Sequence, residues 1–503
     1  MVSEHPLIVI LFAALCLVLW NLNRKKHPYP PGPPADPIIG HFRIMPSSSQ
    51  EEVFHEWAKT YGDIMHLHVP GQNLIILDSH EVATDLLERR SSIYSSRPRF
   101  VVMEILGWHP VVTFLPYSQR FWRHRKIMQK HFGREQSLTF HPILVHHART
   151  FLRRMLEKPN DYDQNILRFA TTSSIKVAYG HDVKSDDEPI LELAHLAMDA
   201  VNNTGAPGNT PIDHLPFLQH FPDWFPGTHY AKYARSRRGV VRQFHDYLFD
   251  PIVKRLQVCA VEPSIAAVEL ENVPEELKGD KEYMLDLKGV AATVFGGGID
   301  TTWSTLTIFV ILILLHPEVQ KKAQEELDSV LGDRLPDFSD EPSLPYVNCV
   351  VQETLRWYPV APLGVPHMST EDDVYRGYFI PKGSIVIANA RGIGLDERKY
   401  KNPYEFNPSR FLPKPEGFGE PEFTTAWGYG RRACPGRYHA EAELWIIIAS
   451  MLAVFDFRKA IGSDGKEITP TLEFAQGLGH HPKPVPCNIC PRSVMAEKLI
   501  RQS

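Results

Sequence analysis

Helical periodicity dominates the chain, and short strand-like runs separate some of the predicted helices. Apolar residues recur at helical spacing from Glu318 to Leu331 and from Tyr346 to Trp357, and Tyr117 to Phe132 combines such a pattern with a basic face. The stretch from Val374 to Asn389 is typical of a β-hairpin, which we expect to turn at Pro381 to Gly383. The pattern therefore predicts a helix-rich protein that also contains short strands.

One apolar stretch, from Leu287 to Leu315, is long enough to cross a membrane and nearly free of charge. Asp300 stands at its middle, after three consecutive glycines, and five serine and threonine hydroxyls follow. A carboxylate near the centre of a bilayer costs about 2.5 kcal/mol or more. We therefore expect a core helix of a large domain, ended by His316 and Pro317.

The N-terminus carries a second apolar segment, from Leu7 to Trp20, which three basic residues follow. Extending it from Val2 to Leu22 supplies the roughly 20 residues that a spanning helix needs. Because the positive charge comes after the segment and no small-residue cleavage site is present, we predict an uncleaved membrane anchor with the rest of the chain in the cytosol. The predicted parts are the anchor over residues 1–23, a stiff basic and proline-rich hinge over residues 24–37, and a folded body over residues 38–503.

Composition argues against two classes of protein. A net charge of −5 gives no reason to expect nucleic-acid binding. The six cysteines are scattered over 503 residues, so a small disulfide-rich secreted fold is not expected. A functional cysteine has to be recognised from its local sequence.

The segment from Trp427 to Gly436, WGYGRRACPG, gives Cys434 a distinctive setting. Glycines on both sides let the backbone pass close to a flat partner because they carry no β-carbon. We expect the loop to open into a helix whose N–H groups and dipole favour a thiolate, a good metal ligand, and Arg431 and Arg432 add positive charge. The alternative from these residues alone is a buried cysteine in a glycine-rich turn.

The same segment resembles the haem-binding signature FxxGxRxCxG of the cytochromes P-450, with Trp427 where the family usually has phenylalanine. Gly430, Arg432, Cys434 and Gly436 match the fixed positions. The resemblance implies a haem b whose iron takes its axial thiolate from Cys434, with Arg432, Trp427 and Gly436 contacting the cofactor. Finer details resemble fungal secondary-metabolite members such as the O-methylsterigmatocystin oxidoreductase-like group.

A second motif, GGIDTT from Gly297 to Thr302, resembles the oxygen-binding pattern of that family. The resemblance implies that Asp300 and Thr301 manage the protons consumed when oxygen is cleaved. We expect Gly297 and Gly298 to remove side-chain bulk where dioxygen sits. The ordinary alternative is a glycine-rich helix crossing.

Glu353 and Arg356 resemble the ExxR motif of the family, and Arg410 in FNPSRF resembles its third partner. The three imply a buried charge network behind the cysteine loop, in which each member is needed because an unpaired buried charge is costly. The alternative for the first two is an ordinary helical ion pair at i,i+3 spacing, usually worth a few tenths of a kcal/mol.

The helix around Tyr117 to Phe132 departs from the family, which usually places tryptophan and arginine four residues apart here, both reaching haem propionates. Alignment puts Phe121 at the tryptophan position and Arg125 at the arginine position, with Trp122 one residue out of step. The resemblance also implies that His367 reaches a propionate, although a core histidine is the alternative. The residues expected to line the substrate pocket are Phe100, Trp108, Gly297, Ala361, Val365 and Leu478.

The resemblance implies a cytochrome P-450 fold, mainly α with small β-sheets, as a single catalytic domain behind an N-terminal membrane anchor. It implies a haem-thiolate monooxygenase that inserts one oxygen atom from O2 into a lipophilic small molecule, a terpenoid or aromatic intermediate of fungal secondary metabolism. One alternative is a haem-thiolate isomerase or dehydratase, against which Asp300 and Thr301 argue. Another is a non-catalytic, membrane-bound haem sensor.

The chain contains no P-loop, no GxGxxG fingerprint and no flavin domain, so electrons must come from a separate protein. The resemblance implies an NADPH-cytochrome P-450 reductase in the endoplasmic reticulum membrane, with cytochrome b5 as a further candidate donor. The catalytic domain would then face the cytosol.

Overall fold

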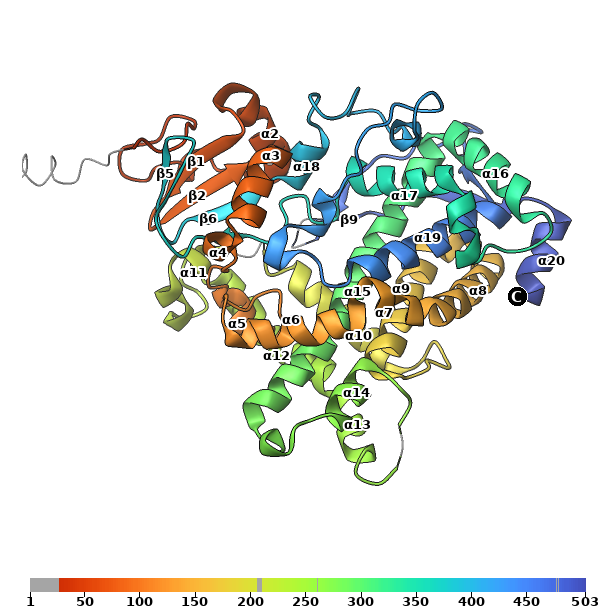
Figure 1. Ribbon diagram of the computed structural model, residues 1–503, viewed down its shortest axis with the longest axis horizontal. Coiled ribbons are helices and arrows are strands. Elements are labelled where there is room, and N and C mark those ends of the chain that lie inside the picture. Colours follow the sequence, from red (N-terminus) through yellow and green to blue (C-terminus); the bar gives the residue numbers. More distant parts are fainter. Residues whose placement is uncertain (1–26, 206–209, 260, 476, 478) are drawn as a thin grey trace, which may run out of the picture.

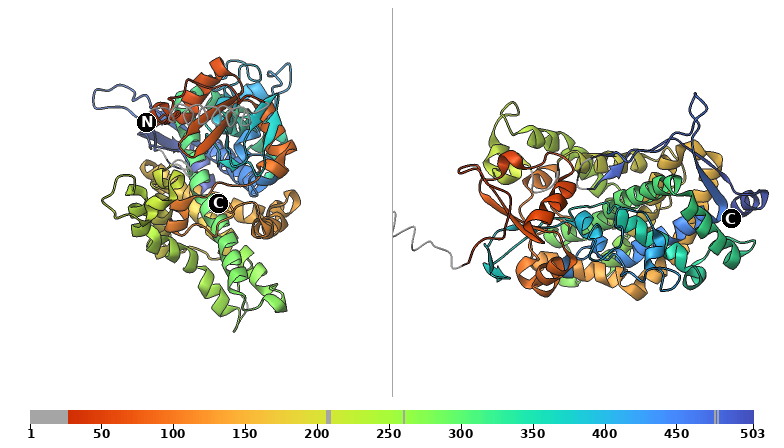
Figure 2. Two further views of the ribbon diagram at one scale, coloured as in Figure 1. Left: turned by 90° about the vertical axis from the view of Figure 1, so that its left-hand side faces the viewer. Right: turned by 90° about the horizontal axis from the view of Figure 1, so that it is seen from above.

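A computed structural model describes residues 27–205, 210–259, 261–475, 477 and 479–503. The predicted anchor over residues 1–23 and the predicted pocket residue Leu478 lie outside the described residues. Helices make up most of the described chain, and the largest sheet lies at one end of the molecule (Figure 1). Seen from above, that sheet and the C-terminus lie at opposite ends (Figure 2).

The helices that sequence periodicity predicts are present at the predicted places. The α-helices run α2 (Gln50–Tyr61), α3 (His80–Ala83), α4 (Ser91–Tyr94), α5 (Val101–Leu106), α6 (Gln119–Phe132), α7 (Arg134–Ser137), α8 (His141–Glu157), α9 (Tyr162–Tyr179), α10 (Pro189–Asn202), α11 (Pro211–His214), α12 (His229–Asp246), α13 (Phe249–Arg255), α14 (Ile265–Glu271), α15 (Lys281–Leu315), α16 (Pro317–Leu331), α17 (Pro345–Trp357), α18 (Ala390–Gly394), α19 (Arg437–Val454) and α20 (Val494–Gln502).

The largest sheet has the strand order β1-β2-β6-β3. The strands β1 and β2 form an antiparallel hairpin, β6 pairs parallel to β2, and β3 pairs antiparallel to β6. Three further pairs, β4 with β5, β7 with β10 and β8 with β9, are antiparallel. The strands run β1 (Ile64–Val69), β2 (Gln72–Leu77), β3 (His367–Met368), β4 (Asp373–Tyr375), β5 (Tyr378–Ile380), β6 (Ile385–Ala388), β7 (Phe455–Lys459), β8 (Phe474–Ala475), β9 (His481–Pro482) and β10 (Cys487–Pro491).

The predicted turn of the hairpin after Val374 is wrong. The chain reverses between β4 and β5 at Arg376 and Gly377, which both have positive φ, at 50° and 82°. Two consecutive residues with positive φ match the right-handed twist of a two-residue hairpin. The segment from Pro381 to Gly383 instead leads into β6, whose apolar side chains join the larger sheet next to β2.

The helix α15 is the predicted core helix, and the prediction is confirmed. It spans 35 residues from Lys281 to Leu315 and is capped by Asp280, whose carboxylate accepts from two backbone N–H groups. Every residue from Leu306 to Leu314 is buried. Among the described residues α15 is the one helix long and apolar enough to cross a membrane, and most of its apolar part is buried within the protein.

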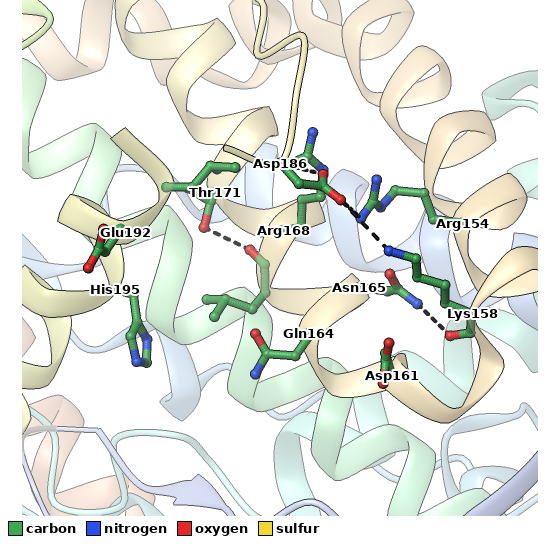
Figure 3. A pocket seen from close by; sticks show the side chains of 12 residues that line it. Arg154, Lys158, Asp161, Gln164, Asn165, Arg168, Thr171, Asp186, Glu192 and His195 are labelled. Atoms are coloured by element: carbon green, nitrogen blue, oxygen red, sulfur yellow. Dashed lines mark hydrogen bonds and ion pairs between the residues drawn. The ribbon is translucent and has the colours of Figure 1, made fainter. Parts of the chain in front are cut away.

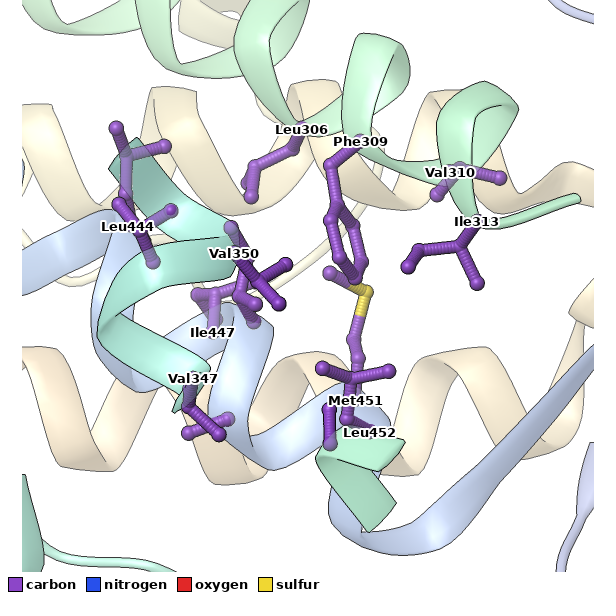
Figure 4. Packing of buried hydrophobic residues seen from close by; sticks show 14 of the residues in the cluster. Leu306, Phe309, Val310, Ile313, Val347, Val350, Leu444, Ile447, Met451 and Leu452 are labelled. Carbon is purple, nitrogen blue, oxygen red and sulfur yellow. The ribbon is translucent and has the colours of Figure 1, made fainter. Parts of the chain in front are cut away.

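The C-terminal half of α15 packs on α17 and α19 (Figure 4). Leu306 and Phe309 of α15 lie beside Val350 of α17, and Ile447 and Met451 of α19 complete this part of the core. Burying a side chain of this size stabilises the fold by roughly 1.5–3 kcal/mol. Because α19 starts just after Cys434, the same packing gives the cysteine loop a rigid base.

Candidate functional site

The loop that carries Cys434 is closed by its own backbone and opens into α19, as predicted. The Cys434 N–H donates to the carbonyl oxygen of Trp427 at 2.7 Å. Gly430 has a φ of +50°, and a β-carbon there would lie 2.5 Å from the carbonyl oxygen of Leu87. The loop can therefore approach that segment this closely only with glycine at position 430.

Cys434 faces an interior space. Solvent reaches the residue although protein surrounds it, and no atom lies within 4 Å of a β-carbon placed at Gly436. Burial raises the pKa of the Cys434 thiol, while a hydrogen bond from the Gly436 N–H and the charge of Arg125 lower it. The predicted stabilisation of a thiolate at the start of the helix is therefore present, but the effect of burial on the pKa is larger. A coordinated metal would lower the pKa of the thiol again, because metal binding deprotonates a thiol outright.

Three arginines, the buried Arg97 and the partly buried Arg125 and Arg432, lie around this loop and donate to backbone carbonyls. Arg125 donates to Ala433 at 2.7 Å, Arg432 donates to Ser95 and Leu115 at 2.7 and 2.8 Å, and Arg97 donates to Val365 and Pro366 at 2.6 and 2.9 Å. Burial lowers the pKa of all three guanidinium groups, that of Arg432 to about 9, and no carboxylate of the described chain offsets this effect. The sequence predicted Arg125 and Arg432 but missed Arg97, for which no motif gives a signal.

His367 belongs to the same group of residues. One of its ring nitrogens lies 2.8 Å from the carbonyl oxygen of Tyr94, and the ring is buried. Burial lowers the pKa of His367, and the charges of Arg97 and Arg432 lower it further. Positive charges that lack an acidic partner fit a bound group that carries its own carboxylates.

Phe121 and Trp122, the two aromatic residues at or next to the family's tryptophan position, lie in different surroundings. Phe121 is buried, and its ring lies 3.8 Å from the guanidinium carbon of Arg432. Trp122 is 46% exposed and lies near the side chain of Arg431. Phe121 therefore takes the inward position on α6, and the indole of Trp122 belongs to the outer surface.

Trp427 lies partly buried against the core, and its indole N–H is buried without a hydrogen-bond partner in the described chain. The aromatic ring thus packs as a phenylalanine would at this position. Among the described residues no group of three or more histidine, cysteine or acidic side chains could hold a metal ion.

The glycines of α15 have different roles, so the prediction for Gly298 is wrong. A β-carbon at Gly297 would meet nothing within 4 Å, whereas one at Gly298 would lie 2.3 Å from the hydroxyl oxygen of Ser174. Gly298 therefore permits α9 to pack closely against α15, and only Gly297 faces open space. Thr301 is exposed and donates its hydroxyl to the Gly297 carbonyl oxygen at 2.7 Å.

Asp300 is covered by two segments that sequence motifs did not connect to it. The side-chain amide of Asn202, at the end of α10, donates to both carboxylate oxygens at 3.3 and 3.2 Å. A β-carbon at Gly479, in the loop between β8 and β9, would lie 3.2 Å from one of these oxygens. Burial raises the pKa of Asp300 to about 6, although the amide contact opposes the shift.

The predicted charge network is present and fully buried. Glu353 accepts from Arg356 at 2.7 and 2.8 Å and from Arg410 at 2.9 Å, and none of the three side chains is exposed. Arg410 also donates to Glu420 at 2.7 Å, a fourth member that the sequence did not reveal. Arg356 donates further to the Gly394 carbonyl oxygen at 2.6 Å. The network therefore links α17 to the irregular chain that precedes the cysteine loop.

Three of the predicted pocket residues lie in one part of the described core. Phe100, Trp108 and Val365 belong to or pack against the same hydrophobic cluster. Trp108 lies between α12 and α15, with its ring 5.0 Å from that of His245 and in reach of Gly296. Ala361 lies four residues before Val365 and is half-buried. The predicted irregular segment that carries Phe100 and Trp108 contains the short helix α5.

Comparison with known proteins identifies the family. The Cytochrome P450 family model matches residues 30–487. The chain is 38% identical to cytochrome P450 monooxygenase ple1 of Rhodocybe pseudopiperita, over 99% of this chain and 97% of that protein. It is also 38% identical to cytochrome P450 monooxygenase COX2 of Coprinopsis cinerea, over 97% and 94%, and 36% identical to claR of Ampulloclitocybe clavipes, over 95% and 89%.

The chain thus belongs to the cytochrome P450 family of haem-thiolate enzymes, oxidoreductases that incorporate oxygen from O2 into their substrates. The residues around Cys434 fit the cofactor of this family, since a single thiolate, a glycine-lined interior space and unneutralised arginines suit an iron porphyrin with two propionates. Enzymes of this family need a redox partner, O2 and a substrate.

Replacing Glu353 with alanine should destabilise the protein by about 3–5 kcal/mol, because two buried guanidinium groups would lose their shared carboxylate. Denaturant unfolding monitored by circular dichroism measures this change. Glu56→Ala is the matched control, since Glu56 pairs with Lys59 at the same kind of helical spacing on the exposed surface. Equal midpoints for the two variants would contradict the assigned role of the network.

Asp300→Asn should remove a pH-dependent cost of folding. The folded chain holds a proton on Asp300 up to about pH 6, whereas the unfolded chain releases it near 3.8, so the wild type loses stability as pH rises through this window. The variant should gain up to about 3 kcal/mol over the wild type between these limits, at 1.36 kcal/mol per pKa unit. Unfolding both proteins at several pH values tests this, and a constant difference would contradict it.

Proposed function

We propose that this chain is a membrane-anchored monooxygenase in which Cys434 binds the haem iron and Asp300 and Thr301 supply protons to the oxygen side. The observation that carries this proposal is the combination of an accessible cysteine inside the protein with three arginines that lack carboxylate partners. In this family such a haem lets one atom of O2 enter an organic substrate while the other leaves as water. The remaining assignments follow from the chain itself.

Residues on several elements would hold the cofactor. Cys434 would supply the thiolate ligand, and the loop glycines, Gly436 among them, would let the backbone approach the porphyrin ring. Arg97, Arg125, Arg432 and His367 would pair with the propionates, and Trp427 would pack against the ring system. The contacts of these residues with backbone carbonyls hold their side chains in place before the cofactor binds. Less conformational entropy is therefore lost when the cofactor binds.

Asp300 and Thr301 act on protons. The hydroxyl of Thr301 donates to the Gly297 carbonyl oxygen and can rotate to donate to a ligand in the open space beside Gly297. Asp300 next to it has a pKa of about 6, close to the pH at which it must both hold and release a proton. The pair therefore suits a relay that delivers protons singly and keeps bulk water out.

The substrate is proposed to be a lipophilic terpenoid or aromatic intermediate of fungal secondary metabolism. The predicted pocket residues are apolar, and Phe100 and Trp108 present aromatic surface in the same cluster as Val365. Such a lining binds apolar molecules by excluding water and offers few polar groups to orient hydrophilic ones. Insertion of one oxygen atom into an apolar molecule is the chemistry that this lining would support.

Electrons are proposed to come from an NADPH-cytochrome P-450 reductase, with cytochrome b5 as a further donor. The outer face of α6, the helix that also carries Arg125, exposes Trp122, Lys126 and Lys130, and Lys130 pairs with Glu269 at 2.6 Å. A basic surface of this kind attracts an acidic donor protein. The chain would be anchored in the endoplasmic reticulum membrane by its N-terminal segment, and Ile38 and Phe42, 90% and 64% exposed directly after the hinge, would lie near the lipid.

Cys434→Ser should abolish the strongly red-shifted absorption that reduced, thiolate-ligated haem shows with carbon monoxide, because a serine hydroxyl does not replace the thiolate. Absorption difference spectra of the purified protein measure this. Cys487→Ser is the control, since Cys487 lies in β10 and should leave the spectrum unchanged. A red-shifted band in the Cys434 variant would reject the ligand assignment.

Thr301→Ala should keep the haem spectrum but send reducing equivalents to peroxide, so that product formed per NADPH falls about tenfold or more. NADPH consumption, peroxide and product are measured in the same assay with reductase. Thr305→Ala is the matched control, because that buried hydroxyl donates to the Thr301 carbonyl oxygen at 2.8 Å. Equal coupling in both variants would remove Thr301 from the mechanism.

A further inference from the structure

Asp300, the proposed acid, has to keep one orientation while it holds and releases a proton. A carboxyl group on a helix rotates about its side-chain bonds unless a neighbour fixes its oxygens. The side-chain nitrogen of Asn202 lies 3.3 and 3.2 Å from the two carboxylate oxygens of Asp300 and donates to both. This nitrogen carries two N–H groups, so one amide holds both oxygens.

The packing of α10 on α15 sets the position of Asn202. Met198 and Asn202 are four residues apart on α10, and Gly296 and Asp300 are four residues apart on α15. A β-carbon at Gly296 would lie 3.3 Å from the terminal methyl group of Met198. Residues at this spacing lie one turn apart on the same helix face, so the contact at Gly296 and the contact at Asp300 belong to one interface.

The loop between β8 and β9 supports the same pair of residues from another side. A β-carbon at Gly477 would lie 2.8 Å from the Asn202 carbonyl oxygen, and one at Gly479 would lie 3.2 Å from a carboxylate oxygen of Asp300. The distance at Gly477 leaves no room for a side chain. The backbone of the loop therefore packs directly against the end of α10 and keeps Asn202 beside α15.

The first half of α10 has a different environment. Glu192 and His195 border a polar cavity of about 360 Å³ that lies among α8, α9 and α10 and opens to the outside (Figure 3). The residues that line this cavity include none of α15. Because a polar space of this size admits water, this part of α10 is solvated, and the contacts at Met198 and Asn202 fix the other end of the helix on α15.

We propose that Asn202 is the positioning residue of the proton relay, and that its amide holds the Asp300 carboxylate in the orientation from which a proton passes to Thr301. The inference rests on the relay by Asp300 and Thr301 proposed above. The O–H bond of the Asp300 carboxyl group breaks, the Thr301 hydroxyl oxygen takes the proton, and this hydroxyl gives its own proton onward into the open space beside Gly297. The two amide N–H groups stabilise the carboxylate that is left until water returns a proton to it, and no bond of Asn202 changes.

An amide suits this place because it donates hydrogen bonds without exchanging protons near neutral pH. A lysine or arginine would form an ion pair with Asp300 and hold it in the ionised state, whereas an apolar side chain would leave the carboxyl group free to rotate. Burial raises the pKa of Asp300 to about 6, and the Asn202 contact and the charge of His195, which is exposed on α10, lower it. The amide thus opposes the effect of burial and keeps the group able to release its proton.

The test compares Asn202→Leu, which keeps the shape of the side chain but removes the donor, with Asn203→Leu as the matched control. Asn203 is exposed at the same helix end, and its amide donates to the Asp199 carboxylate at 2.7 Å. Product formed per NADPH should fall about tenfold in Asn202→Leu, because the acid is no longer oriented. NADPH, peroxide and product are measured with reductase and with naphthalene as an aromatic probe. The KM for the probe and the absorption of the reduced carbon monoxide complex should stay as in the wild type.

Infrared titration of the Asp300 carboxyl group, assigned with Asp300→Asn, separates a positioning role from simple packing. Loss of the hydrogen bonds to the carboxylate should raise the pKa of Asp300 in Asn202→Leu, so that its ionised fraction at pH 6 falls about fivefold, and Asn203→Leu should not change it. Asn202→Gln keeps an amide on a longer side chain and should restore most of the product yield and of the ionised fraction. Asn202→Ala provides a second variant if the leucine protein folds poorly.

The outcomes distinguish this inference from the relay on which it rests. If Asp300→Asn lowers product per NADPH but Asn202→Leu behaves as Asn203→Leu does, the role of Asn202 is refuted and the relay stands. If Asp300→Asn leaves product per NADPH unchanged, the relay itself fails and the inference fails with it. An unchanged pKa of Asp300 in Asn202→Leu, or a lost product yield that Asn202→Gln does not restore, would also refute the inference.

Discussion

A single buried carboxylate, that of Glu353, organises the part of the chain that leads to Cys434. It pairs with Arg356 and Arg410, and Arg410 also pairs with Glu420. Both guanidinium groups donate further N–H groups to backbone carbonyls between residues 394 and 405. This segment forms few regular backbone hydrogen bonds of its own. The ion-paired arginines donate to backbone carbonyls that would otherwise be paired within a sheet or helix. Because the chain runs from this segment into the cysteine loop, the position of the sulfur depends on the network.

Charge also differs between the two sides of the proposed site. The arginines around the cysteine loop find no carboxylate partner in the described part of the chain, whereas a single acid with a raised pKa lies on α15. Each arrangement is costly in isolation, because buried guanidinium groups and a buried carboxyl both lose solvation. A cofactor with its own negative charges offsets the first cost, and the Asn202 amide offsets part of the second.

Much of this arrangement could be predicted from the sequence because it resides in short, dense motifs. The loop around Cys434, the pair Asp300 and Thr301, and the ion-pair network are local patterns, and the core helix follows from an apolar run interrupted by one carboxylate. Contacts between distant segments could not be predicted, and Arg97, Asn202 and Glu420 carry no local signal. The turn of the hairpin was predicted wrongly for a related reason. Turns at Gly377 and at Gly383 both fit the local sequence, and the pairing of β6 with β2 decides between them.

Gly430 has a consequence for how this enzyme tolerates change. The Gly430 backbone lies so close to the Leu87 carbonyl that a β-carbon would not fit between them, so main-chain atoms and not side chains define this close approach. Substitutions of nearby side chains would leave this approach intact. The loop that carries Cys434 can therefore keep its backbone position while the side chains around it change.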